Sequence, residues 1–317
     1  MGEIKAKEFI RGIKQELKKV IVEQEEVMEQ ILICILTKGH GLLEGVPGLG
    51  KTLLIKSLAK TMGIDFKRVQ FTPDLMPSDI TGARIYNTKE KEFEFIKGPV
   101  FTNLLLGDEI NRTPPKTQAG LLEAMEEGRV TIDGESYKLS QPFITFATQN
   151  PIEYEGTYPL PEALLDRFLM KIYIAYPSIA GEAAVVKRYH EGFDKTLENV
   201  SIHQVGSKEE LLSCQKEVET VIVEDSLIEY MVQIIYKTRE FPFVEIGSSP
   251  RGSIALLLAS KANALLKERD FVIPEDIKEM ACPILRHRII LKPEAYVEGV
   301  KTDDVIHEIL SNVKVPR

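Results

Sequence analysis

Residues 45–52 read Gly45-Val-Pro-Gly-Leu-Gly-Lys-Thr52, and this stretch decides the fold. It matches the pattern G-x-x-x-x-G-K-S/T, in which glycines let the backbone turn tightly and aim successive N–H groups inward at phosphate oxygens. The N-terminus of the helix that follows adds further N–H groups. Lys51 is expected to reach the β- and γ-phosphates of ATP, and the Thr52 hydroxyl to bind Mg²⁺. We call residues 45–52 the phosphate loop. The residues expected to contact the nucleotide here are Gly45, Val46, Pro47, Gly48, Leu49, Gly50, Lys51, Thr52 and Leu53.

Strand and helix patterns alternate on both sides of this loop. Leu42–Leu43 leads into it, and Thr52–Met62 reads as a helix. Phe101–Leu106 and Phe143–Thr148 are further apolar runs, and the helical stretch Thr117–Glu127 lies between them. This rhythm predicts an α/β core with a mostly parallel sheet.

Helical patterns frame that core. The first 36 residues read as helical, and strand signals fade after Tyr176-Pro177. We therefore expect an α/β nucleotide-binding core over residues 1–176 and a smaller all-helical domain over residues 177–317. The helices expected in the second domain include Ser226–Arg239, Arg251–Glu268 and Pro274–Ala281.

Two segments show the period-2 alternation of β-hairpins. Arg129–Ile132 and Glu135–Leu139 flank Asp133-Gly134, a strong hairpin turn. Ala83–Tyr86 and Phe93–Ile96 flank a charged turn. Each hairpin could be a mere surface decoration of the sheet.

An acidic pair follows the second apolar run, in Leu104-Leu-Leu-Gly-Asp-Glu109. A strand that ends at Asp108 places this carboxylate beside the phosphate loop, where it can hold Mg²⁺ through water. Glu109 can then orient or deprotonate the attacking water. The metal ligands expected from the chain are therefore Thr52 and Asp108, and Lys51 and Glu109 are expected to be catalytic.

Three further polar residues are candidates for catalysis, and each has a plainer alternative. Asn150 ends the third apolar run and can hold water or the γ-phosphate, or be a turn residue before Pro151. Arg167 can stabilise the charge on a transferring phosphoryl group, or form a surface ion pair. Arg251 opens a helix of the second domain and can sense the nucleotide, or belong to a capping turn.

At this level of detail the chain resembles the MoxR family of AAA+ ATPases, over nearly its whole length from about Val20 to Pro316. The stretches that carry the resemblance are Gly107-Asp-Glu-Ile-Asn-Arg-Thr-Pro-Pro-Lys-Thr-Gln118, Leu121-Leu-Glu-Ala-Met-Glu-Glu-Gly-Arg-Val-Thr131, Ala147-Thr-Gln-Asn-Pro-Ile-Glu-Tyr-Glu-Gly-Thr-Tyr-Pro-Leu-Pro-Glu-Ala163, Leu165-Asp-Arg-Phe168, Ser249-Pro-Arg251 and Leu285-Arg-His-Arg288.

The resemblance implies a role for each matching residue. Asn150 would be sensor 1, Arg167 the arginine finger and Arg251 the sensor 2 arginine. The chain would form a homo-oligomeric ring, commonly hexameric, in which Arg167 acts on the ATP of the adjacent subunit. The two hairpins look like the helix-2 and pre-sensor-1 inserts of the clade that includes magnesium chelatases and replicative helicases, and residues 177–317 look like the helical lid.

The sequence departs from the family at two positions. The family commonly has glycine in the turn near the adenine, where this chain has Glu23 in Ile21-Val22-Glu23-Gln24. Val22 is retained as a candidate adenine contact. Gly107 stands where the family usually has alanine.

The function implied by the resemblance is Mg-dependent ATP hydrolysis that drives chaperone-like remodelling, assembly, activation or cofactor insertion of partner proteins. A von Willebrand factor A domain protein is the expected partner. Two alternatives stay open: a nucleic-acid motor, and a nucleotide-gated scaffold with little turnover. The hairpin tips tell against the motor, because Asn87-Thr-Lys-Glu-Lys-Glu92 mixes charges and Asp133-Gly-Glu135 is acidic.

Composition narrows the class of protein. The 317 residues carry 40 Lys and Arg against 48 Asp and Glu, a formal net charge of -8 that gives no global attraction to nucleic acid. No apolar run approaches the ~18 residues of a membrane span. The N-terminus is charged and has no signal-peptide pattern, so we expect a cytoplasmic protein. The 3 cysteines, Cys34, Cys214 and Cys282, are expected to be buried thiols.

Overall fold

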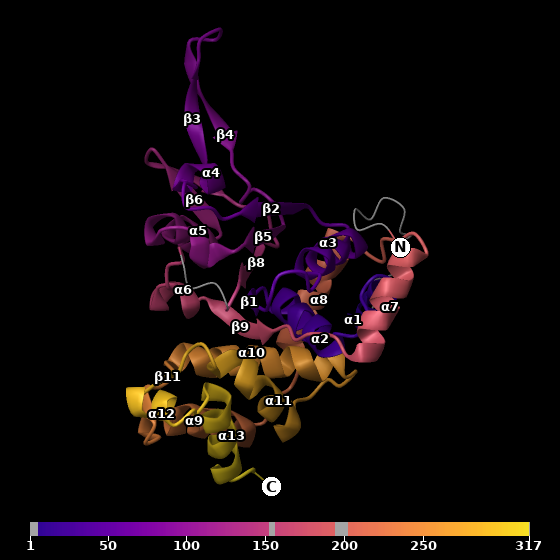
Figure 1. Ribbon diagram of the computed structural model, residues 1–317, viewed down its shortest axis with the longest axis vertical. Helices are drawn as coiled ribbons and strands as arrows, with labels where there is room; N and C mark the ends of the chain where they lie inside the picture. Colours follow the sequence, from indigo (N-terminus) through magenta and orange to yellow (C-terminus); the bar gives the residue numbers. More distant parts are fainter. Residues whose placement is uncertain (1–5, 152–155, 194–201, 317) are drawn as a thin grey trace.

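A parallel sheet of five strands, in the order β2-β5-β8-β1-β9, lies at the centre of the N-terminal half (Figure 1). The computed structural model describes residues 6–151, 156–193 and 202–316. Every neighbouring pair of strands is parallel, which confirms the α/β prediction. The strands are β1 (His40–Glu44), β2 (Phe66–Gln70), β5 (Leu104–Asp108), β8 (Ile144–Gln149) and β9 (Phe168–Tyr173).

Helices cover both faces of this sheet, because alternate strand residues point to opposite sides. Leu43 and Leu106 belong to the larger apolar cluster, and Leu42 and Leu105 to the smaller one. The larger cluster contains buried residues of α1 (Ala6–Leu17), α2 (Glu25–Leu36) and α3 (Lys51–Met62). The smaller one contains those of α4 (Pro77–Thr81), α5 (Pro115–Glu127) and α6 (Glu162–Leu165).

Both predicted hairpins are present. The longer one, β3 (Gly82–Asn87) with β4 (Glu92–Lys97), stands clear of the body at the top of Figure 1. The shorter one consists of β6 (Arg129–Ile132) and β7 (Glu135–Lys138). The ring of Phe95 stacks on that of Tyr137 at 4.2 Å between centroids, and Arg84 pairs with Glu135. The two hairpins therefore support each other.

After β9 the described chain is mainly helical, with one small antiparallel pair, β10 (Val244–Ile246) with β11 (Ile290–Leu291), and one parallel bridge between Ile222 and Phe271. The apolar core is continuous between the two halves, since α10 packs on α2 and α11 packs on β9. No helix among the described residues has the length and apolarity needed to cross a membrane. The helices are α7 (Ile179–His190), α8 (Lys208–Thr220), α9 (Asp225–Glu240), α10 (Pro250–Leu266), α11 (Pro274–Leu285), α12 (Pro293–Val297) and α13 (Thr302–Asn312).

The three cysteines are buried free thiols, as predicted. Burial raises the pKa of Cys214 to about 12 and that of Cys282 to about 11, and raises the pKa of Cys34 still further. The thiolate, which is the reactive form, is therefore scarce at neutral pH.

Candidate functional site

The phosphate loop joins β1 to α3, and its glycines meet two different requirements. Gly48 and Gly50 have φ angles of 89° and 77°, in the left-handed region that glycine enters at little cost. A Cβ on Gly45 would lie 2.7 Å from the carbonyl oxygen of Ile174, so the close approach of β9's continuation requires glycine there. Helix α3 begins at Lys51, which places the ammonium group and the Thr52 hydroxyl in its first turn.

The Lys51 ammonium group is folded back onto the loop. Its Nζ donates to the carbonyl oxygens of Gly45 at 2.6 Å and Val46 at 2.9 Å. Half-burial lowers the pKa of Lys51, and the charges of Asp108 and Glu109 oppose this shift. Phosphate oxygens that replaced the two carbonyls would give the ammonium charged acceptors, which make stronger hydrogen bonds.

Thr148 joins the two acidic residues of the site. Its hydroxyl donates to Asp108 Oδ1 at 2.5 Å and accepts from the backbone N–H of Glu109 at 2.8 Å. Glu109 has a φ of 58°, an uncommon left-handed conformation for a residue other than glycine. The hydrogen bond from Glu109 N to Thr148 helps to hold that backbone, so β8 fixes where both carboxylates point.

Strand β2 supplies two residues that the sequence did not reveal. Arg68 Nη2 pairs with Asp108 Oδ2 at 2.7 Å, and Gln70 Nε2 donates to Glu109 Oε2 at 2.8 Å. Arg112 also pairs with Glu109, at 3.0 Å. Glu109 is thus held by a neutral amide and a guanidinium.

Thr52 and Asp108 offer hydroxyl and carboxylate oxygens, which are ligands that suit Mg²⁺. Among the described residues no group of three His, Cys, Asp or Glu side chains is arranged to hold a metal ion. A magnesium ion bound here would therefore complete its coordination with nucleotide phosphates and water. This is the usual arrangement for magnesium in nucleotide sites.

Two other predicted residues lie at the same edge of the sheet. Asn150 is buried and follows β8 directly, and the neighbouring Gln149 accepts from the N–H of Gly45. On the other side of the loop, Gln24 Nε2 donates to the carbonyl of Leu49, which brings the Val22 segment against the phosphate loop. The candidate sensor and the candidate adenine contact both flank the loop.

The glutamate at position 23 keeps a glycine-like backbone. Glu23 has a φ of 58°, so the turn retains the geometry for which glycine is favoured. Its carboxylate accepts from the N–H and hydroxyl of Ser178, at 2.9 and 2.6 Å. Glu23, where the family commonly has glycine, therefore links this turn to the start of α7.

The two candidate arginines, Arg167 and Arg251, lie near each other, and Arg251 and Arg288 both bind Asp166. Arg251 Nη1 donates to Asp166 Oδ2 at 3.0 Å, and Arg288 Nε donates to Asp166 Oδ1 at 3.1 Å. Arg167 pairs with Glu126. Partial burial lowers the pKa of Arg167, and the nearby positive charge of Arg251 lowers it further.

This arginine cluster, defined as Arg167, Arg251 and Arg288, is at the opposite edge of the sheet from the phosphate loop. Phe168, directly after Arg167, is in register with His40 at the start of β1, whereas the loop follows the end of β1. Five residues of strand span roughly 16 Å at ~3.3 Å per residue. Neither Arg167 nor Arg251 is therefore beside Lys51 of its own chain.

The stretch Leu285-Arg-His-Arg288 attaches the helical half to β9. The guanidinium of Arg288 donates to the carbonyl oxygens of Asp166, Phe168, Leu169 and Ile284. Burial lowers the pKa of Arg288 to about 10, with Asp166 opposing the shift. His287 contacts the carbonyl of Phe168 through Nε2 at 2.9 Å. The sequence placed this motif in the lid, and the structure shows that it fastens the lid beside Arg167.

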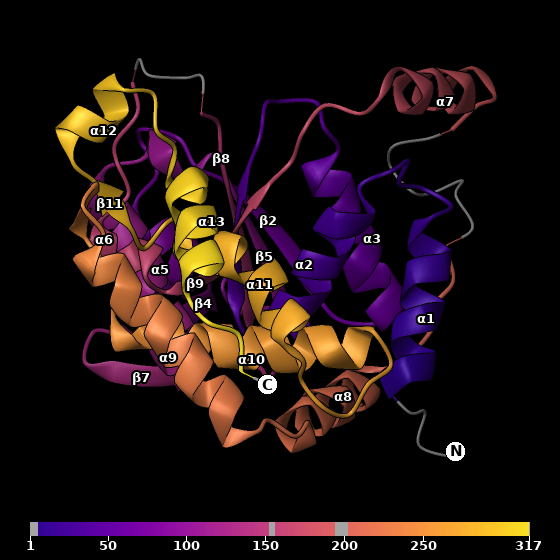
Figure 2. The ribbon, with the colours of Figure 1, turned by 90° about the horizontal axis from the view of Figure 1, so that it is seen from below.

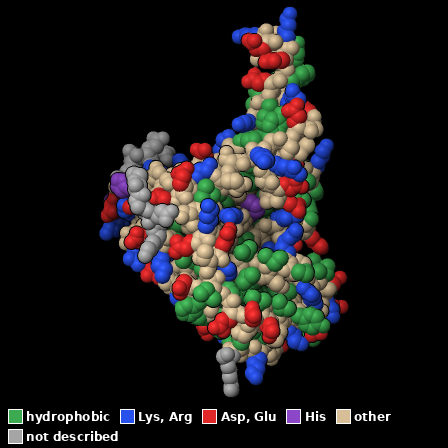
Figure 3. Space-filling model, turned by 180° about the vertical axis from the view of Figure 1, so that it is seen from behind, with side chains coloured by type: hydrophobic (Ala, Val, Ile, Leu, Met, Phe, Trp, Pro, Cys, Tyr) green, Lys and Arg blue, Asp and Glu red, His purple; other side chains and the backbone are tan. Residues whose placement is uncertain are grey.

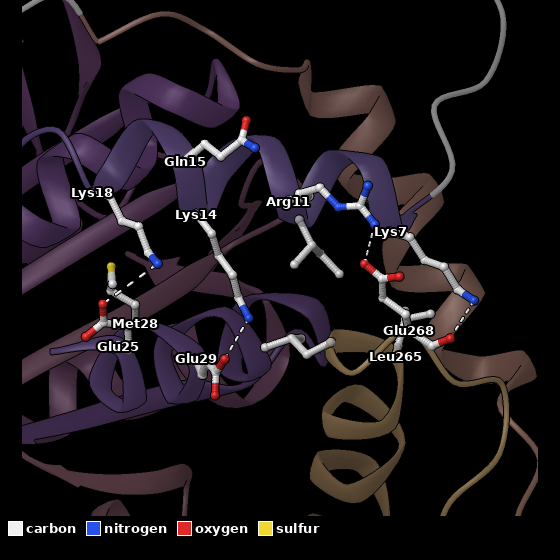
Figure 4. A pocket seen from close by; sticks show the side chains of 12 residues that line it. Lys7, Arg11, Lys14, Gln15, Lys18, Glu25, Met28, Glu29, Leu265 and Glu268 are labelled. Carbon is white, nitrogen blue, oxygen red and sulfur yellow. Dashed lines mark hydrogen bonds and ion pairs between the residues drawn. The ribbon is translucent and has the colours of Figure 1, made fainter. Parts of the chain in front are cut away.

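A cavity of about 300 Å³ lies elsewhere, between α1, α2 and α10, and shares no residue with the phosphate loop (Figure 4). Cations of α1 cross it to acidic partners: Arg11 pairs with Glu268, and Lys14 pairs with Glu29. Lys18 reaches Glu25 at 3.8 Å. These ion pairs clamp α1 onto its neighbours, so the cavity is a seam between helices.

Comparison with known proteins agrees with this geometry. Residues 40–170 match the family described as "ATPase family associated with various cellular activities (AAA)", and residues 236–309 match an "AAA lid domain". A crystal structure of a protein from Cytophaga hutchinsonii, named as a candidate ATPase, superposes with a TM-score of 0.91 at 44% identity, covering 98% of this chain and 96% of that one.

Relatives match over nearly the whole chain. An uncharacterized protein of Bacillus subtilis, YeaC, is 52% identical over 95% of this chain and 93% of its own length. Chaperone MoxR1 of Mycobacterium tuberculosis is 42% identical over 95% of this chain and 81% of its own length. Protein MoxR of Methylorubrum extorquens is 30% identical over 95% of this chain and 94% of its own length. The chain therefore belongs to the MoxR family of AAA+ ATPases.

Proposed function

We propose that this ATPase works as a head-to-tail ring, commonly a hexamer, in which each neighbour supplies Arg167 and Arg251 to complete the active site. Mg-dependent turnover would drive chaperone-like remodelling, assembly or cofactor insertion of partner proteins. The observation that carries the proposal is the placement of both arginines a strand length away from Lys51 of their own chain. A heterologous (head-to-tail) contact places one edge of a subunit against the opposite edge of the next. It can therefore bring Arg167 and Arg251 of one subunit close to Lys51 of its neighbour.

Within one subunit the residues around the phosphate loop divide the work. Lys51 and the loop N–H groups bind the phosphates, and Thr52 and Asp108 would hold a magnesium ion, which would supply positive charge against the charge that develops on the phosphoryl group. Glu109 orients the attacking water or takes its proton, and Asn150 positions that water or the γ-phosphate. Val22 and Gln24 border the adenine side, and residues 46, 47, 49 and 53 complete the nucleotide contacts.

Arg251 then acts in trans, like Arg167. Its guanidinium is bound to the residue that directly precedes Arg167, so both groups face the same neighbouring site. Phosphoryl transfer places negative charge on three equatorial oxygens, and a guanidinium supplied by another subunit stabilises that charge. The division into a core of residues 1–176 and a lid of residues 177–317 fits this scheme, because Arg288 couples the lid to the end of the core.

Proteins are the favoured client class. The β3–β4 hairpin exposes four large apolar side chains, with 49 to 61% of each accessible: Ile85, Tyr86, Phe93 and Ile96. Figure 3 shows acidic, basic and hydrophobic side chains interspersed along it. A surface of this kind suits an apolar protein segment better than a phosphate backbone, which attracts unbroken positive charge. The name of the relative Chaperone MoxR1 points the same way. A von Willebrand factor A domain protein remains the proposed partner.

The two alternatives make different demands. A nucleic-acid motor needs basic hairpin tips, but the first tip alternates Lys89, Glu90 and Lys91, and the second, Asp133-Gly-Glu135, is acidic. A nucleotide-gated scaffold does not require a precisely positioned Glu109, whereas here Thr148 and Gln70 both hydrogen-bond this residue. This network favours ATP turnover over the scaffold alternative. The cytoplasmic location expected from the sequence stays a prediction.

Mixing two inactive variants tests the shared site. A Glu109→Gln subunit cannot hydrolyse ATP in its own site but can still supply Arg167 to a neighbour. An Arg167→Ala subunit has Glu109 in its own site but cannot supply the arginine. We expect the mixture to recover ATPase activity, with a specific rate that rises with concentration as light scattering reports a ring. In the control, Arg167→Ala is mixed with the double variant Glu109→Gln/Arg167→Ala. No subunit of this mixture carries Arg167, so no ATPase activity should be recovered. A mixture as inactive as this control would contradict finger action in trans.

A further inference from the structure

Helix α7 carries its apolar side chains on the outside. Ile179 is 93% exposed, Val186 63% and Tyr189 67%, and the only residue that the helix buries is Gly181. An amphipathic helix normally turns its apolar side inward, and contiguous exposed apolar surface marks an interaction site. Ile179, Ala183 and Val186 line one shallow depression together with Glu182, Lys187 and His190. We call these six residues the α7 face.

Polar contacts hold α7 on the body with that face outward. Glu23 binds Ser178, whose hydroxyl caps the helix by accepting from Gly181 N at 3.0 Å. Near the other end, Arg188 donates to the carbonyl oxygens of Lys18 and Lys19 at 3.2 and 3.1 Å. The helix is thus held in place by hydrogen bonds, and Ile179 and Val186 stay exposed.

A matching surface lies at the opposite end of the molecule. In Figure 2, α7 projects at one upper corner and α12 at the other, and Figure 1 shows the same separation. On α12, Val297 is 89% exposed and Tyr296 59%. We call these two residues the α12 face.

The charges at one end of each surface are complementary. The last turn of α7 carries exposed Lys187 and His190, with Lys187 also reaching Glu191 at 3.9 Å and Glu182 lying in the first turn, whereas Glu294 and Glu298 border Val297 on α12. The α7 face lies on the same side of the molecule as α3, which the phosphate loop opens, and the α12 face lies on the side of α6, which precedes Arg167. A contact that delivers Arg167 and Arg251 to the next subunit's phosphate loop therefore brings the α12 face toward α7.

We propose that the α7 face of each subunit docks onto the α12 face of its neighbour, so that a second copy of this chain covers both surfaces in the ring. This inference rests on the proposed head-to-tail ring and names the surface that holds it together. Because Glu23 ties α7 to the Val22 turn beside the phosphate loop, the contact joins the neighbour's lid to the nucleotide edge of the site.

A charge placed on each surface tests the contact. Val186→Asp and Val297→Asp should each raise, by at least tenfold, the protein concentration at which Mg-ATP induces assembly, as measured by light scattering and by the rise in specific ATPase rate. Val232→Asp is the matched control, since Val232 on α9 is 51% exposed and lies outside both faces. Far-UV circular dichroism checks that each variant is folded.

The outcomes separate the two proposals. A wild-type chain that stays monomeric with Mg-ATP at every concentration overturns both the ring and the contact. A wild type that assembles, with Val186→Asp assembling at the same concentration, overturns the contact alone and leaves the ring intact. Loss of assembly in both surface variants, with Val232→Asp unchanged, supports both.

Cross-linking gives a second readout that does not depend on weakened assembly. Chains carrying Val186→Cys are mixed with chains carrying Val297→Cys, in the Glu109→Gln background with Mg-ATP, and treated with a short bismaleimide. The native cysteines are buried, so the introduced thiols react first. Covalent dimers are expected, and Val232→Cys in place of Val297→Cys should give none. A ring that forms without cross-linked dimers overturns the contact.

Discussion

The carboxylate of Asp166 accepts a hydrogen bond from the guanidinium of Arg251 over 3.0 Å, which holds the start of α10 beside Arg167. The other carboxylate oxygen accepts a hydrogen bond from Arg288, whose side chain is only 3% exposed. Asp166, the residue directly before the candidate finger Arg167, therefore binds both Arg251 and Arg288. In the proposed ring, a shift of the lid would move Arg167 and Arg251 together through Asp166.

Asp166→Asn is expected to lower both stability and turnover. It removes the charge that compensates the buried guanidinium of Arg288, and leaving a buried charge unpaired costs about 3–5 kcal/mol of unfolding free energy. The ATPase rate should fall more than ATP affinity, because the nucleotide binds to the loop and not to this cluster. Urea unfolding and steady-state kinetics measure the two effects.

Glu240→Gln is the control for that experiment. Glu240 pairs with Lys237 on the exposed side of α9, and exposed pairs contribute about 1 kcal/mol or less. Equal losses of stability in Asp166→Asn and Glu240→Gln would contradict the role given to Asp166.

Two threonines of β8 allow a matched test of how the acidic pair is positioned. Thr148→Val removes the hydroxyl that bonds Asp108 and Glu109, so we expect the unfolding free energy to fall by about 1–3 kcal/mol and kcat to fall at least tenfold. Thr145 is buried on the same strand, and within the described part of the chain its hydroxyl has no hydrogen-bond partner. Thr145→Val should therefore keep kcat and leave stability equal or higher. Comparable kinetics for the two variants would show that Thr148 does not position Glu109.

Much of the site could be predicted from local sequence. The phosphate loop needs glycines at set positions, and Gly48 and Gly50 do have positive φ angles. The strand that ends at Asp108 and the helix that begins at Pro250 lie where the sequence predicted them, although the strand begins at Leu104 and not at Phe101. These features depend on short-range patterns of apolar residues and turn residues, which can be recognised without knowing the tertiary contacts of the chain.

Other parts of the structure could not be read from the sequence. Strand β2 carries the exposed residues Lys67, Arg68 and Gln70 among few apolar ones, so its periodicity is weak, although Arg68 and Gln70 orient both acids. The contacts of Arg288 with Asp166 join residues 122 positions apart, and no local pattern reports such a pair. Ser178 and Glu23, which form a hydrogen bond, are also 155 positions apart and could not be paired from local sequence.

Lys51→Met should abolish ATP binding while leaving the fold intact. The ammonium donates to the carbonyls of Gly45, which is buried, and Val46, which is half-buried, and the tip of the loop at Pro47 and Gly48 is exposed. We expect ATP affinity to fall at least a hundredfold, equivalent to about 3 kcal/mol, in a fluorescent-nucleotide titration. Lys56→Met, on an exposed position of the same helix, is the control and should bind as the wild type does. Retained affinity in Lys51→Met would refute the assignment of residues 45–52 as a phosphate loop.

The buried imidazole of His40 should make the fold sensitive to mild acid. Its Nδ1 accepts from the N–H of Thr145 at 3.0 Å and its Nε2 faces the carbonyl of Met125 at 3.1 Å, so the neutral ring with its proton on Nε2 satisfies both. Burial lowers the pKa of His40 to about 4, and the charge of Arg167 adds to the shift. The unfolded chain, with a pKa near 6.5, binds this proton first, so stability is complete above about pH 6.5 and falls as the pH drops toward 4.

For His40 alone the loss between pH 7.5 and pH 5 should be about 2 kcal/mol of unfolding free energy. His287, whose pKa burial also lowers, shifts stability in the same direction. His40→Gln removes the titrating group, so the stability difference between wild type and variant should narrow by about 2 kcal/mol over that range in urea unfolding. A difference between wild type and His40→Gln that is the same at pH 7.5 and pH 5 would mean that His40 does not titrate on unfolding.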